Sequence, residues 1–332
     1  ELSHCYVIKT SNNKIIVMDG GLDNAKETYN GNSYLPEAIR AILGLKENEY
    51  FEIEAWFLSH AHSDHYGEMI MMFREYNERS NYKVNNIYFD FPDMASSKFD
   101  PSDYSLEGLE KLQAGMDNYA KVNGIACVPG YYHCLNGKVV NADAVANGLT
   151  ITIDGVDFEI LQTQSPEDDQ VNGNSMVIRV VPTYENAKTC MFLNDTSVWS
   201  GAKLLKTYGK ALKSDVVQMA HHGQGGVNQD VYDAIDAQVR LWPTPIWVWK
   251  NESGIYQIDE VREWVMGKNF LESDEYDIVA GLYASYPKKS TDVGEWAKVL
   301  DGMKIEFPYV LPERIIETTE ATTAEPIEPV EH

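Results

Sequence analysis

Four side chains able to bind a metal ion lie within six positions of this chain, in the sequence His60-Ala61-His62-Ser63-Asp64-His65. They directly follow the apolar run of residues 55–58, which has the composition of a buried strand. Imidazole nitrogen and carboxylate oxygen are ligands for zinc, and also serve iron or manganese. A His-rich surface loop is the alternative, but clusters with this spacing are uncommon by accident. The segment therefore predicts a fold that builds a metal site at the end of a strand.

Two further predicted strands end in residues of the same kinds. Residues 190–193 are followed by Asn194-Asp195, and residues 216–220 are followed by His221-His222. A single acid after a strand indicates little, because Asp is common in turns. Three strand ends that carry His and Asp are more informative, since neighbouring strands of a sheet deliver their ends to one edge.

The composition limits the class of protein. The chain has 332 residues with 44% hydrophobic content, enough for one large α/β domain or two smaller ones. Its 27 Lys and Arg against 51 Asp and Glu give a formal net charge of −24, which repels a polyanion at long range and argues against a nucleic-acid partner. No stretch approaches the length of an apolar transmembrane helix, so we expect no membrane span.

The cysteines and the two ends of the chain give weaker indications. Four cysteines are too few in a chain of this length for a disulfide framework. Cys127 and Cys134 could pair, but a role as small hydrophobic residues is favoured. Residues 312–332 are acidic and rich in Thr and Pro, which is typical of a disordered tail or stalk. Because the chain begins at Glu1, any signal peptide would already be removed, and we favour an extracytoplasmic or secreted location over a cytoplasmic one.

Periodicity predicts alternating strands and helices, with hairpins first. The expected strands are residues 6–8, 14–18, 55–58, 87–89, 149–153, 158–161, 175–181, 189–193, 216–220, 240–242 and 278–283. The expected helices are residues 36–43, 67–79, 105–122, 202–212, 228–235 and 258–265. Residues 92–147 have the character of an insert. This order favours an α+β sandwich with sheets inside and helices outside.

With these motifs in view, the chain resembles the metallo-β-lactamase-fold superfamily over most of residues 1–311, taken as one domain. The segment His60-x-His62-x-Asp64-His65 is similar to that superfamily's H-x-H-x-D-H signature. The resemblance implies a four-layer αββα sandwich with a dinuclear metal site at the sheet edges. It implies two divalent metal ions, zinc foremost, with manganese or iron as alternatives.

The resemblance also implies a ligand set. His60 and His62 would bind one metal and Asp64 and His65 the second, while the carboxylate of Asp195 would bridge both. His221 or His222 would complete the second metal. Of these two we prefer His221 as the ligand, because it is the first residue past the strand. Asp19 matches the buried acid that orients a ligand histidine from behind.

The mechanism expected of such a centre needs no Ser or Cys nucleophile. Two cations lower the pKa of a bridging water and hold a hydroxide ready. Asp64 or Asp195 would orient that hydroxide, and His222 would donate a proton to the leaving oxygen.

A narrower resemblance points to one branch of the superfamily. Residues 172–178, the Asn194-Asp195 strand end and His221-His222-Gly223 together are similar to the branch that contains competence-type DNA-uptake nucleases and bacterial phosphorylcholine esterases. Two positions depart from it, because Asn194 stands where Gly is usual and Gln224 where Ser is usual.

A further histidine found in many members has no clear counterpart here. The candidate is His133, which lies in the insert and which we expect not to be a ligand. The first metal could instead be completed by water, by Asn174 or by an acid of residues 167–169.

The substrate is indicated only by an aromatic segment. Trp242, Trp247 and Trp249, with Tyr256 beyond them, could line a pocket that binds a quaternary ammonium group through cation–π attraction. The alternative is that these tryptophans fill the core. The sequence therefore predicts a metal-dependent hydrolase of a phosphodiester or related ester, in a small molecule or at a cell surface. The rival hypotheses are a nuclease of the DNA-uptake type and a metal-stabilised binding module without turnover.

Overall fold

The chain folds into two β-sheets packed face to face, with helices on both outer sides. The computed structural model describes residues 4–22, 34–94, 98–124, 148–165, 167–185, 187–237, 239–244 and 246–266. The expected strand at residues 278–283, the tail at 312–332, His133, Cys127 and Cys134 lie outside the described residues. Cys5 and Cys190, which are described, form no disulfide.

The first sheet comes from the N-terminal half of the chain. It has the order β1-β2-β3-β4, with β5 also paired to β3. Its strands are β1 (Cys5–Lys9), β2 (Ile15–Asp19), β3 (Phe51–Phe57), β4 (Tyr82–Val84) and β5 (Ile87–Tyr88). β1 runs antiparallel to β2, whereas β2, β4 and β5 run parallel to β3. The end of β2, the end of β3 and the start of β1 therefore meet at one edge.

The second sheet follows with the order β11-β10-β9-β8-β7-β6. Its strands are β6 (Thr150–Ile153), β7 (Val156–Gln162), β8 (Val177–Pro182), β9 (Cys190–Phe192), β10 (Val216–Gln218) and β11 (Val239–Leu241). β9, β10 and β11 are parallel, while the β6–β7, β7–β8 and β8–β9 pairs are antiparallel. The ends of β9 and β10 thus lie side by side.

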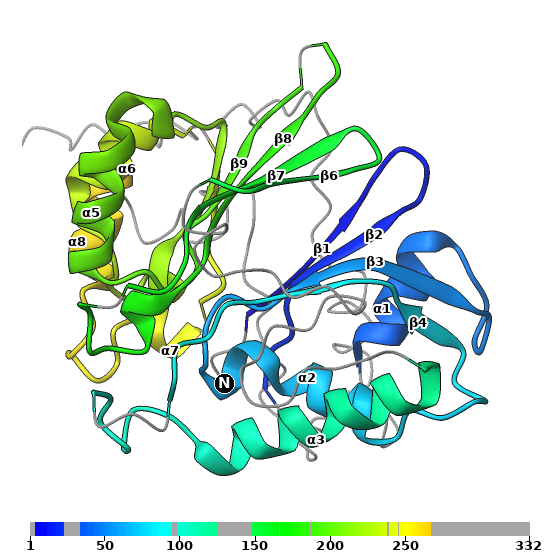
Figure 1. Cartoon of the computed structure of the whole chain (residues 1–332). Helices are drawn as coiled ribbons and strands as arrows, with labels where there is room; N and C mark the ends of the chain where they lie inside the picture. Colours follow the sequence, from blue (N-terminus) through cyan, green and yellow to red (C-terminus); the bar gives the residue numbers. More distant parts are fainter. Residues whose placement is uncertain are drawn as a thin grey trace, which may run out of the picture.

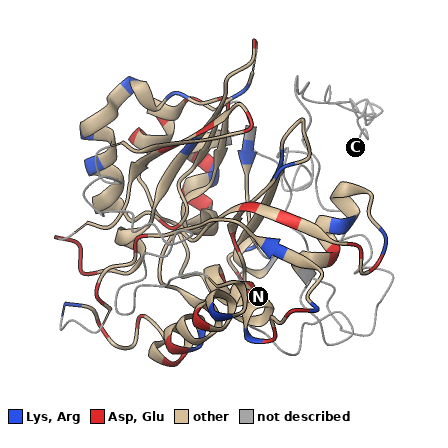
Figure 2. Ribbon diagram, turned by 45° about the vertical axis from the view of Figure 1, so that its right-hand side comes forward, with Lys and Arg blue, Asp and Glu red and all other residues tan. Residues whose placement is uncertain are grey.

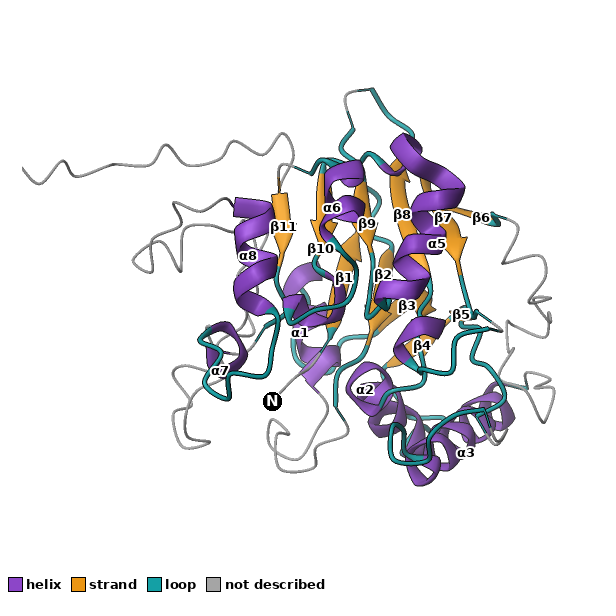
Figure 3. Cartoon of the chain, turned by 90° about the vertical axis from the view of Figure 1, so that its left-hand side faces the viewer, coloured by secondary structure: helices purple, strands orange, loops and turns teal. Residues whose placement is uncertain are grey.

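Helices cover the outer face of each sheet (Figures 1 and 3). The first sheet packs on α1 (Tyr34–Leu43), α2 (Ser63–Arg74) and α3 (Leu106–Asn123). The second sheet packs on α5 (Val198–Tyr208), α6 (Gln229–Ile235) and α8 (Ile258–Met266), with the short α7 (Ile246–Trp249) near its end. The predicted four-layer αββα sandwich is therefore confirmed.

Strand alternation explains how one short strand serves two cores. In β2 every side chain is buried; Ile15 and Val17 pack toward the helices, while Ile16 and Met18 pack toward the other sheet. Between the sheets, Phe57 of β3 stacks on Phe158 of β7 with their ring centroids 5.3 Å apart. Burial on both faces makes β2 a rigid base for Asp19, its last residue.

Several elements differ from their predicted bounds in ways that concern the site. α2 begins at Ser63 rather than at residue 67, so the His motif runs into the helix instead of preceding it. An acid in the first turn, here Asp64, is favourable because it meets the positive end of the helix dipole. The strand before the motif begins at Phe51, and α7 was not predicted. Within the described residues, no helix combines the length and apolar character that crossing a membrane requires.

Candidate metal centre

Side chains from the ends of four strands lie together at the edge of the two sheets. Asp19 ends β2, Ser59 and His60 follow β3, and Asp195 follows β9. His222 follows β10 in a tight turn. His4 joins them because the antiparallel register pairs Cys5 with Asp19 and so brings the residue before β1 to this edge.

The carboxylate of Asp195 is surrounded by imidazoles. Its Oδ2 atom lies 3.3 Å from Nε2 of His65, 3.5 Å from Nε2 of His222, 3.8 Å from Nε2 of His60 and 3.9 Å from Nε2 of His221. Ligand atoms about 2.1 Å from a tetrahedral zinc ion are about 3.4 Å apart. The spacing is therefore that of ligands around shared cations.

A second set of close groups includes Asp64. Its Oδ2 atom lies 3.2 Å from Nε2 of His222 and 3.8 Å from Nε2 of His65. Among the described residues, two groups of possible ligands contain these acids, one made of His60, His65 and Asp195, and the other of Asp64, His65 and His222. A third group, made of His4, Asp19 and His65, lies behind them, and in each group the ligand atoms lie within 4.8 Å of one another. His65 belongs to both of the first two groups, so it stands between two candidate metal positions.

His62 lies to one side of this cluster. Its Nδ1 atom is 3.0 Å from Nε2 of His60, and its Nε2 atom is 3.7 Å from Oδ1 of Asp103. His62 occupies the position just before α2 and is partly exposed, whereas His60 is buried. It therefore forms the rim of the site on the α2 side.

Hydrogen bonds from behind aim the imidazoles of the first sheet. The Nδ1–H of His65 donates to Oδ2 of Asp19 at 2.7 Å. The Ser59 hydroxyl donates to the same oxygen at 2.8 Å and accepts from Nδ1 of His60 at 2.9 Å. With both Nδ1 atoms occupied in this way, the Nε2 atoms of His60 and His65 are left to face Asp195.

The two imidazoles of the His221-His222 turn differ in burial and in their hydrogen-bond partners. His221 (φ 48°) and His222 (φ 55°) both adopt left-handed backbone, which costs about 1–2 kcal/mol per residue outside glycine. His222 is 1% exposed, and its Nδ1–H donates to the carbonyl of Pro243 at 3.0 Å. The side chain of His221 is 33% exposed and lies 3.4 Å from the amide nitrogen of Asn172. His222 is thus the deeper of the two imidazoles, whereas His221, our preference from the sequence, lies on the exposed side.

Backbone conformation accounts for Asn194, where the resembling branch has Gly. Asn194 has φ 50°, a region that glycine adopts freely and that Asn tolerates better than most residues. Its side-chain amide donates to the Met176 carbonyl at 2.5 Å, and its backbone N–H donates to Oε1 of Gln218 at 2.6 Å. Asn194 therefore permits the positive-φ turn, and its side chain adds the bond to Met176 that a glycine could not make, next to Asp195.

The charges of the site demand positive counter-charge. Burial lowers the pKa of the His65 imidazole, but the carboxylates of Asp195, Asp19 and Asp64 outweigh it and raise that pKa well above its usual range. Burial raises the pKa of the Asp64 carboxyl, but the nearby imidazoles of His65 and His222 lower it to about 2. Three carboxylates in so small a volume require either bound protons or bound cations.

A further observation indicates that these side chains are suited to bind divalent cations. Within the described chain, the Nε2 atoms of His65 and His222 and the Oδ1 atom of Asp195 are buried and make no hydrogen bond. A buried polar atom without a partner costs about 1–3 kcal/mol. These three atoms come from separate strand ends and are of the types that bind zinc, iron or manganese.

The aromatic segment after β11 mainly packs in the core beside the His221-His222 turn and contributes less to any pocket. Trp242 and Trp249 are each 1% exposed and pack edge to face in the core of the second sheet, with ring centroids 5.1 Å apart. The ring of Trp242 lies directly against Gly223. Trp247 is partly buried and contacts the ring of Tyr256 at 5.7 Å between centroids. Trp242 and Trp249 therefore fill the core, which was the alternative to a pocket in the sequence analysis.

Replacing Gly223 by Ala should destabilise the protein by about 2–4 kcal/mol, because two penalties add. Gly223 has φ 75°, and an added Cβ would lie 2.3 Å from the Trp242 ring. The control is Gly44→Ala, where φ is 70° and the Cβ would meet nothing within 4 Å. Thermal and urea unfolding should show a clearly larger loss for Gly223→Ala; equal losses would contradict the packing described here.

Asn174 and Asp168, two alternatives for completing the first metal, are engaged elsewhere. Oδ1 of Asn174 accepts from the backbone N–H of Ser165 at 2.8 Å. Oδ2 of Asp168 accepts from the hydroxyls of Ser197 and Ser200 at 2.9 and 3.1 Å. Both side chains therefore hold the loop before β8 in place.

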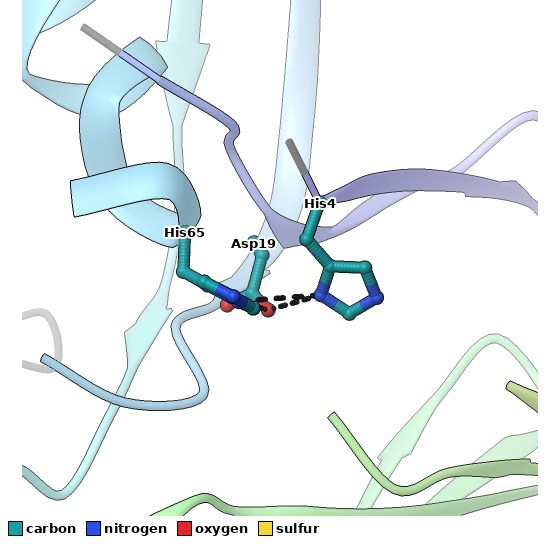
Figure 4. A group of neighbouring side chains, drawn as sticks. All are labelled: His4, Asp19 and His65. Carbon is teal, nitrogen blue, oxygen red and sulfur yellow. Dashed lines mark hydrogen bonds and ion pairs between the residues drawn. The ribbon is translucent and has the colours of Figure 1, made fainter. Parts of the chain in front are cut away.

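The sequence analysis did not identify the residues that contact the candidate ligands from behind or beside them. His4 carries no motif, and only the pairing of β1 with β2 places it beside Asp19 (Figure 4). Asp103, Asn172 and Pro243 contact His62, His221 and His222 respectively. A polar residue near a ligand in space but far from it in sequence gives no local signal.

Comparison with known proteins found similar solved structures at low sequence identity. No protein-family model and no curated protein matched the chain. Among solved structures, a diphosphatase from the PhnP family is similar with 11% identity over 72% of this chain and 72% of its own, at a TM-score of 0.36. An archaeal metallo-β-lactamase superfamily protein from Sulfolobus tokodaii shows 16% identity over 71% and 80%, at 0.34. CmlA, a diiron β-hydroxylase from Streptomyces venezuelae, shows 13% identity over 73% of this chain and 43% of its own, at 0.40.

Proposed function

We propose that the chain is a dinuclear metal-dependent hydrolase that acts on a phosphodiester or a related ester. The observation that carries the proposal is the position of Asp195, whose Oδ2 atom faces the Nε2 atoms of His60, His65 and His222 at 3.3 to 3.8 Å. A carboxylate among imidazoles from two sheets is suited to bridge two cations. When bound, such a pair lowers the pKa of a coordinated water and stabilises negative charge on the reacting oxygen.

The ligand assignment follows the geometry for every residue except His62, which keeps the place that the resemblance implies. We assign His60 and His62 to one cation, and Asp64, His65 and His222 to the other, with Asp195 between them. The Ser59 hydroxyl and the Asp19 carboxylate hold His60 and His65 in place from behind. The Pro243 carbonyl does the same for His222. Each ligand thus has a fixed tautomer, which favours metal binding.

His221 is proposed to contact substrate at the open side. It is the more exposed member of the pair, and its Nε2 atom lies 3.9 Å from Asp195 and 3.4 Å from the side-chain nitrogen of Asn172. An imidazole at this position can bind an anionic oxygen or donate a proton to a leaving group. The roles of His221 and His222 are therefore exchanged relative to the sequence prediction.

The charge distribution favours a small ester over long DNA. Acidic and basic residues are interspersed over both halves of the molecule (Figure 2). Many described cations face an acid, as in the pairs Lys14–Glu54, Arg179–Glu159, Lys188–Asp215 and Lys213–Asp236. With a net charge of −24, the chain would repel a polyanion before contact.

A substrate panel tests the proposal. The protein would be stripped with a chelator, reloaded with Zn²⁺, Mn²⁺ or Fe²⁺, and offered bis-(p-nitrophenyl) phosphate, p-nitrophenyl phosphorylcholine, a carboxylic ester and single-stranded DNA. We expect metal-dependent release of p-nitrophenol from a small diester, with little cleavage of DNA. Hydrolysis of DNA alone would establish the nuclease alternative, and metal binding with no hydrolysis at all would favour the non-enzymatic binding module.

A further inference from the structure

His4 shares the carboxylate oxygen that aims His65. The Nδ1 atoms of His4 and His65 each lie 2.7 Å from Oδ2 of Asp19, on either side of it (Figure 4). The two Nδ1 atoms are 3.3 Å apart, and both N–H groups are satisfied by donating to the one carboxylate oxygen. His4 and Asp19 are 0% and 1% exposed. The arrangement is a buried His–Asp–His bridge.

The backbone of His4 is tied to the same elements. Its N–H donates to the carbonyl of Asp64 at 3.2 Å, and its carbonyl accepts from the N–H of Gly21 at 2.9 Å. The N–H of Gly20 in turn donates to the carbonyl of His65 at 2.6 Å. His4, the residue before β1, is therefore hydrogen-bonded directly to the first turn of α2, which carries two candidate ligands.

We propose that His4 is a positioning residue for the metal centre, which acts through Asp19 to hold the Nε2 atom of His65 toward Asp195. This inference rests on the proposed metal centre. With the His4 imidazole present, Asp19 has donors from His4, His65 and Ser59 on one oxygen and the Ser59 N–H on the other. Without it, Asp19 loses one of the three donors on the oxygen that also holds His65, so the ring of His65 is held less firmly.

Two substitutions separate this role from simple packing. In His4→Asn the side-chain nitrogen lies near the place of Nδ1, so the bond to Asp19 can be kept. In His4→Gln the amide lies near the place of Nε2, so that bond is lost while more volume is kept. His4→Ala removes both, and Lys9→Ala, at the exposed far end of β1, is the matched control.

The experiment measures Zn²⁺ affinity by chelator competition, the Co²⁺ absorption spectrum and the melting temperature of the metal-free protein. We expect His4→Ala and His4→Gln to bind the metal about 10–100-fold more weakly with an altered Co²⁺ spectrum, and His4→Asn and Lys9→Ala to stay near wild type. Unchanged affinity and spectrum in His4→Ala, or rescue by Gln rather than Asn, would overturn the inference. If the wild-type protein itself bound neither Zn²⁺ nor Co²⁺, the proposed metal centre would be refuted together with the role of His4. Loss of melting temperature equally in all three His4 variants, without the ranking in affinity, would mean a packing role and also overturn it.

Discussion

Asp195→Asn should abolish turnover, and it should prevent two metal ions from binding together at the site. The substitution keeps the volume of a side chain that is 2% exposed, but replaces a charged bridging oxygen by a neutral amide. Losing about 4 kcal/mol of transition-state stabilisation corresponds to about a thousandfold in kcat/KM. We expect at least that loss on the best small diester of the panel, together with a reduced metal content.

The control for Asp195→Asn is Asp236→Asn. Asp236 also has a positive φ, of 47°, but it is exposed and pairs with Lys213 at the surface. Its replacement should leave kcat/KM within about a factor of two, since exposed ion pairs contribute about 0–1 kcal/mol. Circular dichroism would establish that both variants fold. A folded Asp195→Asn protein with near wild-type activity and metal content would contradict the bridging role.

His222→Ala and His221→Ala should fail in different ways, although the residues are adjacent. His222 is buried with its Nε2 atom 3.2 Å from Asp64, so its removal should cost a metal ligand. If about 12 kcal/mol of binding is spread over four ligands, one ligand is worth about 3 kcal/mol, or about a hundredfold in affinity. His221→Ala should keep the metal affinity within a few-fold and lower kcat instead.

The comparison needs metal affinity and kinetics measured on the same preparations. The two variants share the same strained turn, so a general disruption would affect both equally. Equal loss of metal in the two proteins, with equal loss of stability, would indicate collapse of the turn. Loss of metal in His221→Ala alone would restore the sequence-based preference for His221 as the ligand.

Residues adjacent to a strand end were accessible to sequence reasoning. His60 and Asp195 lie within two residues of apolar runs, His65 lies in the helix turn that follows His60, and neighbouring strands deliver their ends to one edge. The order of strands and helices predicted sheets inside and helices outside, and the resemblance to the metallo-β-lactamase-fold superfamily implied the four layers. Both inferences depend on local pattern, which a single sequence contains.

Features that depend on pairing or backbone turns were not accessible. His4 reaches Asp19 only because β1 and β2 pair with Cys5 opposite Asp19. The choice between His221 and His222 depends on two successive left-handed residues, which sequence periodicity does not reveal. Trp242 fits a pocket or a core equally well by composition, and its contact with Gly223 decides for the core.

The central claim is that two cations are held around Asp195, and the metal content of the purified protein tests it most directly. Protein reloaded with Zn²⁺, Mn²⁺ or Fe²⁺ and passed over a desalting column would be analysed by inductively coupled plasma mass spectrometry. The account predicts about two metal ions per chain for wild type with at least one of these metals. Wild-type protein that retains none of them after reloading, while remaining folded, would contradict the account.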